Sequence, residues 1–263
     1  MKWTSGKWGF GWAAVNSDDR LAVAIRGRFS FSGRDLFSNI ELILESGSWS
    51  CLLGSSGVGK STLMRLIAGL ETGGRFDGKV EASDGLSLVG RVAYMSQADL
   101  LLPWLSVRQN ISLGCRLRGE STDETAINRL VESIGLSDHQ SKKPAQLSGG
   151  MRQRTALARV LMEDAPLVLL DEPFSALDAR TRAEMQHLAY TVLEGRTVLL
   201  VTHDPAEAMR LAHDLYVLSP GGLTKKRVPS AQPIRALDDA EMLQAQAELL
   251  MALHNQLDQE SQL

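Results

Sequence analysis

The stretch GSSGVGKS at residues 54–61 decides how the rest of the chain is interpreted. It has the pattern G-x-x-x-x-G-K-[ST] and lies between a short apolar segment, 49–53, and a segment with the composition of a buried helix, 62–68. A strand, a glycine-rich loop and a helix are the context in which this pattern holds phosphates. The glycines let successive backbone N–H groups face phosphate oxygens, and the helix adds the positive end of its dipole. The stretch therefore predicts a site for a nucleoside triphosphate.

Within this loop, the pattern predicts the roles of two side chains. Lys60 is expected to lie along the β- and γ-phosphates, and the Ser61 hydroxyl is expected to ligate Mg²⁺. ATP and Mg²⁺ are thus the expected cofactors. The loop residues expected to contact the nucleotide are Gly54, Ser55, Ser56, Gly57, Val58, Gly59, Lys60, Ser61 and Thr62.

The composition of the chain limits the classes of function that it can serve. The 263 residues allow one large α/β domain or a core with a subdomain. A net charge of −3 gives no general basic field, so we expect no nucleic-acid partner. Two cysteines, Cys51 and Cys115, make no disulfide framework and favour a reducing cytoplasm. Since no apolar run approaches the roughly 18 residues of a membrane span, any membrane association is expected to run through a partner.

Changes in pattern along the chain suggest its organisation. Residues 1–20 carry three tryptophans, but glycines interrupt their apolar part, so we expect a flexible extension rather than a signal peptide. Residues 21–228 are expected to form the ATPase domain, which begins with antiparallel strands up to residue 53 and includes a helical subdomain at about 98–165. Residues 229–263 are expected to form a helical tail, which either packs on its own core or serves self-association.

Carboxylates follow a run typical of a buried parallel strand. Residues 167–170 are continuously apolar and are followed by Asp171 and Glu172. Because ligands bind at the carboxyl ends of such strands, we expect Asp171 in the Mg²⁺ shell and Glu172 beside the water that attacks the γ-phosphate. Another apolar strand, 197–201, is followed by His203, which is expected to reach the γ-phosphate or the same water.

Phe31 is an aromatic residue upstream of the phosphate loop, and two interpretations of it stay open. If the ring is exposed, it can stack on the purine base of the nucleotide. If it is buried, it is an ordinary core residue.

At residues 147–154, LSGGMRQR, the chain resembles the ATP-binding subunit of an ABC transporter, and the resemblance covers roughly residues 21–220. It implies an α/β fold: a P-loop NTPase core of ABC type with an antiparallel β subdomain and an inserted α-helical subdomain. Six motifs occur in the family's order: Phe31, the loop 54–61, Gln97, LSGGMRQR, LVLLDEP at 167–173, and Ser175-Ala176-Leu177-Asp178 followed by His203.

The resemblance also implies how two chains cooperate. Ser148, Gly149 and Gly150 begin a helix whose free N–H groups need an anion. In this family the motif LSGGMRQR, which is called the signature, covers the ATP held by the other subunit. The resemblance therefore implies a homodimer in which the nucleotides are sandwiched between the two chains. Asp178 is expected to communicate across that interface. Gln97 is expected to link Mg²⁺ and the attacking water to a groove near residues 97–107, where an integral membrane permease docks.

The segment after Gln97 indicates a branch of the family. Leu102-Pro103-Trp104 is similar to ATPases that import nitrate, sulfonates, taurine or the pyrimidine precursor of thiamine. The alternative is that Trp104 is ordinary core of the helical subdomain. An importer of this branch implies an ATPase at the cytoplasmic face of the inner (plasma) membrane, with an external solute-binding protein acting indirectly.

Two other functions share the same catalytic residues or the same class of ATPase. One is an ABC exporter or lipoprotein-extracting ATPase, which only the segment around Trp104 separates from an importer. The other is a soluble ABC-type ATPase that acts on nucleic acid or ribosomes, for which the sequence shows no second ATPase module, coiled coil or zinc insertion.

Overall fold

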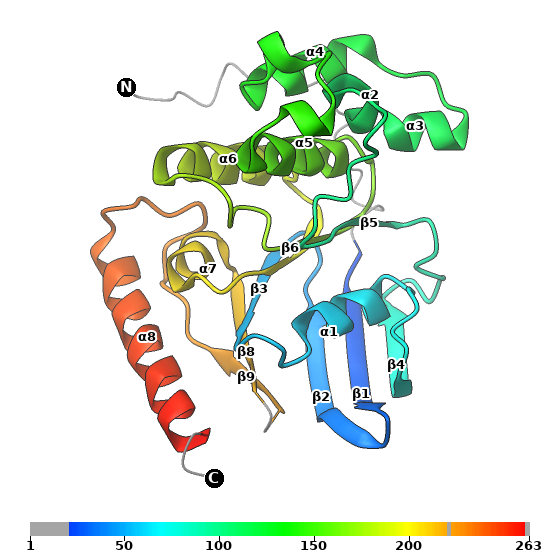
Figure 1. The fold of residues 1–263 in the computed structure, drawn as a ribbon. Helices are drawn as coiled ribbons and strands as arrows, with labels where there is room; N and C mark the ends of the chain where they lie inside the picture. Colours follow the sequence, from blue (N-terminus) through cyan, green and yellow to red (C-terminus); the bar gives the residue numbers. More distant parts are fainter. Residues whose placement is uncertain (1–20, 220–221, 261–263) are drawn as a thin grey trace.

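In a computed structural model, the chain folds into a central six-stranded sheet, a separate three-stranded sheet and a group of helices (Figure 1). The structure describes residues 21–219 and 222–260, and the predicted extension 1–20 lies outside them. Over the described ranges, no helix is both long and apolar enough to cross a bilayer.

The central sheet has the strand order β5-β6-β7-β3-β8-β9. Neighbours from β5 to β8 are parallel, and only β9 runs antiparallel to β8. Both faces of the parallel strands are buried, because alternate residues of one strand belong to opposite cores; Val198 and Leu200 face one, Leu199 and Val201 the other. The strands are β3 (Trp49–Gly54), β5 (Val92–Met95), β6 (Leu167–Asp171), β7 (Thr197–Val201), β8 (Asp214–Ser219) and β9 (Gly222–Lys226).

Helices cover one face of this sheet, and a helix with the antiparallel sheet covers the other. The first core receives buried side chains from α5 (Gly149–Leu161), α6 (Ala179–Val192) and α7 (Pro205–Leu211). The second receives them from α1 (Lys60–Ile67) and from the antiparallel sheet. The expected α/β fold with an antiparallel subdomain is therefore confirmed.

The antiparallel sheet has the order β2-β1-β4, with β1 (Val23–Phe31), β2 (Arg34–Leu44) and β4 (Arg75–Ala82). The expectation of antiparallel strands up to residue 53 holds for β1 and β2 but was wrong for β3, which pairs in parallel with β7 and β8 in the central sheet. Strand β4 was not expected. In β4 no residue is fully buried, so the apolar alternation that marks a strand is weak. The strand is nevertheless held closely: a Cβ on Gly27 of β1 would lie 2.5 Å from the carbonyl oxygen of Asp77.

The helical region contains α2 (Val107–Ile111), α3 (Leu113–Arg118), α4 (Glu124–Ser133) and α5, with short 3₁₀ turns at Ser137–His139 and Pro144–Gln146. Residues 107–118 form two short helices rather than one, because Ser112 ends α2 and begins α3. Ser112 and the buried Asn110 are weak helix formers. The Asn110 side chain bonds to backbone groups of Leu102, Leu105 and Ser106, which fixes the preceding loop.

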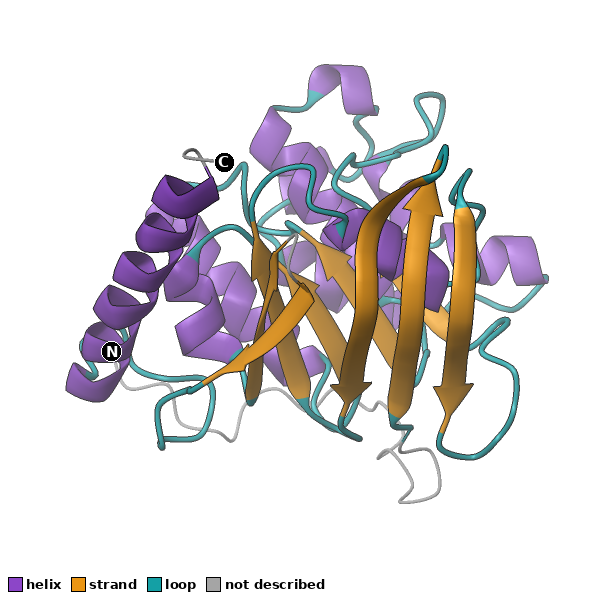
Figure 2. Cartoon of the chain, turned by 90° about the horizontal axis from the view of Figure 1, so that it is seen from below, coloured by secondary structure: helices purple, strands orange, loops and turns teal. Residues whose placement is uncertain are grey.

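The tail forms α8 (Ala240–Glu260), which lies along one edge of the molecule (Figure 2). Met242 and Leu249 are buried in the first core, so this helix packs on its own chain. Leu243 and Leu250 are exposed. The approach to the helix is anchored by the buried Arg235, whose guanidinium donates to the carbonyls of Met209, Ala212 and Pro229.

Candidate nucleotide site

The loop between β3 and α1 lines a cavity with Gly54, Ser56, Gly57 and Gly59. Gly59, the N-cap of α1, has φ of +110° and has no side chain that could accept hydrogen bonds from the first N–H groups of the helix. That backbone conformation strongly favours glycine. The first N–H groups of α1 are therefore available to an anion, as at other helix N-termini that bind phosphate.

Lys60 is the first residue of α1, and its ammonium group lies over the loop. Its Nζ donates to the carbonyl oxygens of Gly54 at 2.7 Å and Ser55 at 2.9 Å. Burial lowers the pKa of the Lys60 ammonium, although Glu172 and Asp171 act in the opposite direction. The loop thus holds a cation beside the backbone donors.

Ser61 and Asp171 form a pair of oxygen groups from different elements. The Ser61 Oγ donates to Asp171 Oδ2 at 2.7 Å, across from α1 to the end of β6. Burial raises the pKa of the Asp171 carboxyl, while the hydrogen bond from Ser61 lowers it. A hydroxyl and a carboxylate are hard oxygen donors of the kind that Mg²⁺ prefers, so the pair fits that ion.

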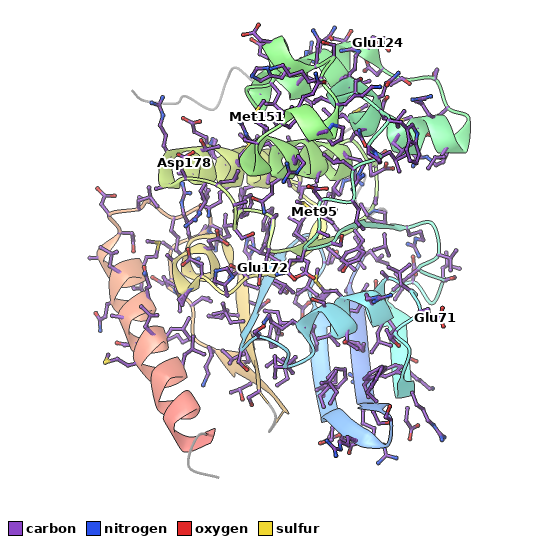
Figure 3. All side chains as sticks on the ribbon, in the orientation of Figure 1. Glu71, Met95, Glu124, Met151, Glu172 and Asp178 are labelled. Carbon is purple, nitrogen blue, oxygen red and sulfur yellow. The ribbon has the colours of Figure 1, made fainter. Side chains whose placement is uncertain are left out.

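Glu172, which is labelled in Figure 3, follows directly in the sequence. Its side chain meets two other predicted residues. Its Oε2 lies 3.4 Å from Gln97 Nε2 and 3.3 Å from His203 Nδ1. The φ of Glu172 is +51°, which residues with a side chain rarely adopt. Its N–H donates to Val201 at 2.9 Å, and its carbonyl accepts from Gln153 Nε2 at 2.9 Å. Hydrogen bonds on both sides hold this conformation.

These groups line one cavity of about 430 Å³. The structure thus brings together the three residues expected in catalysis, the Ser61–Asp171 pair and most of the phosphate loop. Ser55 contributes its carbonyl to Lys60, and the Val58 side chain is buried in the second core, so only backbone groups of Val58 remain for a ligand. The lining residues are Gly54, Ser56, Gly57, Gly59, Lys60, Ser61, Thr62, Gln97, Asp171, Glu172 and His203.

Within the described residues, 21–219 and 222–260, the lining of this cavity does not include the signature residues Ser148, Gly149 and Gly150. Ser148 is the N-cap of α5, and its Oγ accepts from the N–H of Met151 at 3.3 Å. Gly150 lies against another loop, where a Cβ would be 3.2 Å from the carbonyl oxygen of Ala176. Gly149 is different: the nearest neighbour of a Cβ there would be Arg152 Nη2 at 4.0 Å. The exposed start of α5 is thus free to meet a ligand held elsewhere.

Two aromatic side chains whose interpretation was open are both exposed. Phe31 at the end of β1 is 52% exposed and Trp104 is 64% exposed, so in each case the core alternative was wrong. Phe31 stays available for stacking on a base. Leu100 and Leu117 are also exposed, and we refer to these three exposed apolar side chains of the segment 100–117 together as the apolar surface.

Arginines of the signature helix connect the site to this apolar surface, and the sequence analysis did not single them out. Arg159 donates to the carbonyls of Leu100 and Asp99, both at 2.9 Å, and Arg152 Nε lies 2.9 Å from Asp99 Oδ2. The segment after Gln97 is therefore fixed to α5. The only sequence signal for these contacts is the placement of Arg152 and Arg159 about one and three helical turns after Ser148.

The fold and the site define a nucleoside-triphosphate-binding protein of the phosphate-loop class. Residues 37–175 match the family model for the ABC transporter. An uncharacterized ABC transporter ATP-binding protein from Haemophilus influenzae is 44% identical and covers 85% of this chain and 95% of its own length. The chain belongs to the ABC transporter family, as an ATP-binding subunit whose ATPase activity is coupled to transport.

Other relatives have more specific names. The aliphatic sulfonates import ATP-binding protein SsuB 1 of Rhodococcus jostii is 45% identical over 82% of this chain and 86% of that protein. SsuB 2 of Pseudomonas syringae pv. tomato is 40% identical over 86% of this chain and 95% of that protein. A solved dimeric ATP-binding cassette in a post-hydrolysis state, bound to ADP and Pi, has a TM-score of 0.69 and 26% identity, covering 80% of this chain and all of that one.

Proposed function

We propose that the chain is the ATPase subunit of a bacterial importer for a small solute, and that aliphatic sulfonates are the solute class. The observation that carries the ATPase role is the meeting of Gln97, Glu172 and His203 beside the phosphate loop. The import role and the solute class are supported by the names of relatives at 40–45% identity. Nitrate, taurine and the thiamine pyrimidine precursor are the other solutes of the branch. No observation favours the exporter or the nucleic-acid alternative.

In this proposal, each site residue has its own role in ATP hydrolysis. The backbone of the loop and Lys60 bind the phosphates of ATP, and Phe31 stacks on the base. Ser61, Asp171 and Gln97 would hold Mg²⁺, which offsets phosphate charge when it is bound. Glu172 accepts the proton of the attacking water, and His203 orients the γ-phosphate or that water.

A second copy completes the site in this proposal. Its Ser148, Gly149 and Gly150 place the exposed N-terminus of α5 on the γ-phosphate, so that two ATP molecules lie between two chains. Support comes from the exposed signature helix and from the dimeric structural relative. ATP binding then favours the closed dimer, and hydrolysis opens it.

Attachment to the membrane runs through a permease in this proposal. The apolar surface of Leu100, Trp104 and Leu117 is the proposed docking area, next to a groove of about 740 Å³ lined partly by Leu117 and Arg159. Arg159 belongs to α5 and also holds the segment after Gln97. Helix α5 therefore connects the proposed docking area with the nucleotide site. The chain would thus act at the cytoplasmic face of the inner membrane, and an external binding protein would deliver the solute.

Growth on a sulfonate tests the importer and its solute class together. A strain that lacks this chain is expected to stop growing when an alkanesulfonate is the sole sulfur source and to grow normally on sulfate. The wild-type gene should restore growth, and a gene carrying Glu172→Gln should not. Unchanged growth on several alkanesulfonates, with lost growth on nitrate or the thiamine precursor, would reject sulfonates and keep the importer. Unchanged growth on all of them would contradict import by this branch.

A further inference from the structure

Arg182 of α6 connects two loops that border the catalytic groups. Its Nη2 donates to the carbonyl oxygen of Leu177 at 3.1 Å, in the loop that precedes α6. On its other side, Nη1 lies 3.3 Å from Asp204 Oδ2, and Nε lies 3.6 Å from Glu207 Oε1. One planar guanidinium therefore holds the loop before α6 and the start of α7 at the same time.

The partners of Arg182 on α7 fix the residues on both sides of His203. Thr202 Oγ1 donates to Glu207 Oε2 at 2.7 Å and accepts from the N–H of Asp204 at 3.0 Å. Asp204 Oδ1 also accepts from the N–H of Ala206 at 2.8 Å, which caps α7. Glu207 is only 4% exposed, and burial raises the pKa of its carboxyl while Thr202 and Arg182 lower it. The backbone of His203 is thus held between two residues that this network orders.

A second cavity, of about 260 Å³, adjoins the histidine loop, and it shares Glu172 and His203 with the nucleotide cavity. Ser175 and Arg182 line its other side. Since His203 borders this cavity and its side chain is 63% exposed, hydrogen bonds and ion pairs of its neighbours help to set the position of the histidine loop.

We propose that Arg182 is a positioning residue for ATP hydrolysis, which ties the loop at 175–178 to the loop that carries His203. Arg182 is not among the residues that line the nucleotide cavity, and it acts by holding His203 within reach of Glu172. In the proposed dimer, the loop that ends at Asp178 lies at the interface, so the same tie transmits closure of the dimer to His203. This inference rests on the proposed roles of Glu172 and His203.

The test compares Arg182→Gln with a matched control on the same helix. Arg180 has a side chain that is 89% exposed, and it forms an ion pair with Glu184 in the next turn. Arg182→Gln is expected to lower kcat by between about tenfold and a hundredfold, as for displaced catalytic groups, with the Kd for ATP within about twofold of wild type. Arg180→Gln is expected to change neither. Wild-type kcat in Arg182→Gln would overturn the inference.

A second variant separates positioning from stability. Arg182→Gln leaves the buried Glu207 without its cation, which alone can destabilise the fold. Arg182→Met combined with Glu207→Gln removes both charges, so its Tm should recover toward wild type while kcat stays low. Recovery of kcat together with Tm would overturn the positioning role. Arg182→Lys keeps a positive charge but lacks the planar guanidinium that also donates to Leu177. An intermediate kcat is therefore expected for this variant.

Two reference variants show whether the site itself is right. Glu172→Gln and His203→Ala should each hydrolyse far more slowly than Arg182→Gln. If both retain wild-type hydrolysis, the proposed catalytic site fails, whatever Arg182 does. If both are inactive and Arg182→Gln is fully active, the site stands and only the inference about Arg182 falls.

Discussion

Glu172→Gln is expected to lower kcat for ATP hydrolysis by at least about a hundredfold, because a general base contributes between about 10² and 10⁴ to the rate. The amide has nearly the shape of the carboxylate but cannot accept the proton of the attacking water. Lys60, Ser61 and Asp171 keep their contacts in this variant, so MgATP should bind with nearly unchanged affinity. Bound but unhydrolysed ATP should then hold the dimer closed.

Two measurements check this expectation. Steady-state phosphate release gives kcat, and size-exclusion chromatography with light scattering gives the mass with and without MgATP. The wild-type chain should elute mainly as a monomer, and Glu172→Gln should become a dimer when MgATP is present. Glu71→Gln is the matched control, since this exposed residue lies well away from Glu172 in Figure 3. Wild-type hydrolysis in Glu172→Gln would remove Glu172 from catalysis.

Gly149→Asp is expected to abolish hydrolysis and dimerisation while the single chain still folds and binds ATP. A Cβ at Gly149 has 4.0 Å of space, and an acidic residue in the first turn favours helix α5. In the proposed dimer, however, this carboxylate would face the γ-phosphate of the other chain. Like charges placed together cost several kcal/mol, which corresponds to a loss of about a hundredfold or more. In one preparation, the Kd for ATP checks nucleotide binding, the Tm checks folding, and kcat checks hydrolysis.

A mixture of variants tests whether the site is shared between chains. Lys60→Ala chains should fail to bind ATP but retain a normal signature, and Gly149→Asp chains have the opposite defect. In a mixed dimer, one site combines the intact loop of the second variant with the intact signature of the first. The mixture should therefore hydrolyse ATP faster than either variant alone. If the mixture is as inactive as its components, the signature does not act across the interface.

Much of the central sheet could be predicted from the sequence because its strands are buried on both faces. Residues of β6 and β7 are all buried, and such strands appear as continuous apolar runs. The edge strands β4 and β9 were missed for the opposite reason. RFDGKVEA in β4 has no fully buried residue, and GLTKK in β9 has one, so backbone pairing rather than apolar pattern defines them.

The candidate site was predictable where it depends on sheet topology. Asp171, Glu172 and His203 follow neighbouring parallel strands, whose carboxyl ends meet at one edge. The exposure of Phe31 and Trp104 was not predictable, because spacing alone does not tell an exposed aromatic from a buried one. Arg182 was also missed, since its contacts join three segments that only the folded chain brings together.

The central claim, that this chain drives a membrane permease, is tested most directly by affinity purification from detergent-solubilised native membranes, with mass spectrometry of the proteins that co-purify. We expect a multi-span permease with the tagged wild-type chain, and much less of it with Trp104→Ala. Leu237→Ala, which alters another exposed leucine, should retain the permease. Recovery of ribosomal or DNA-associated proteins without a permease would leave the ATPase assignment intact and contradict transport.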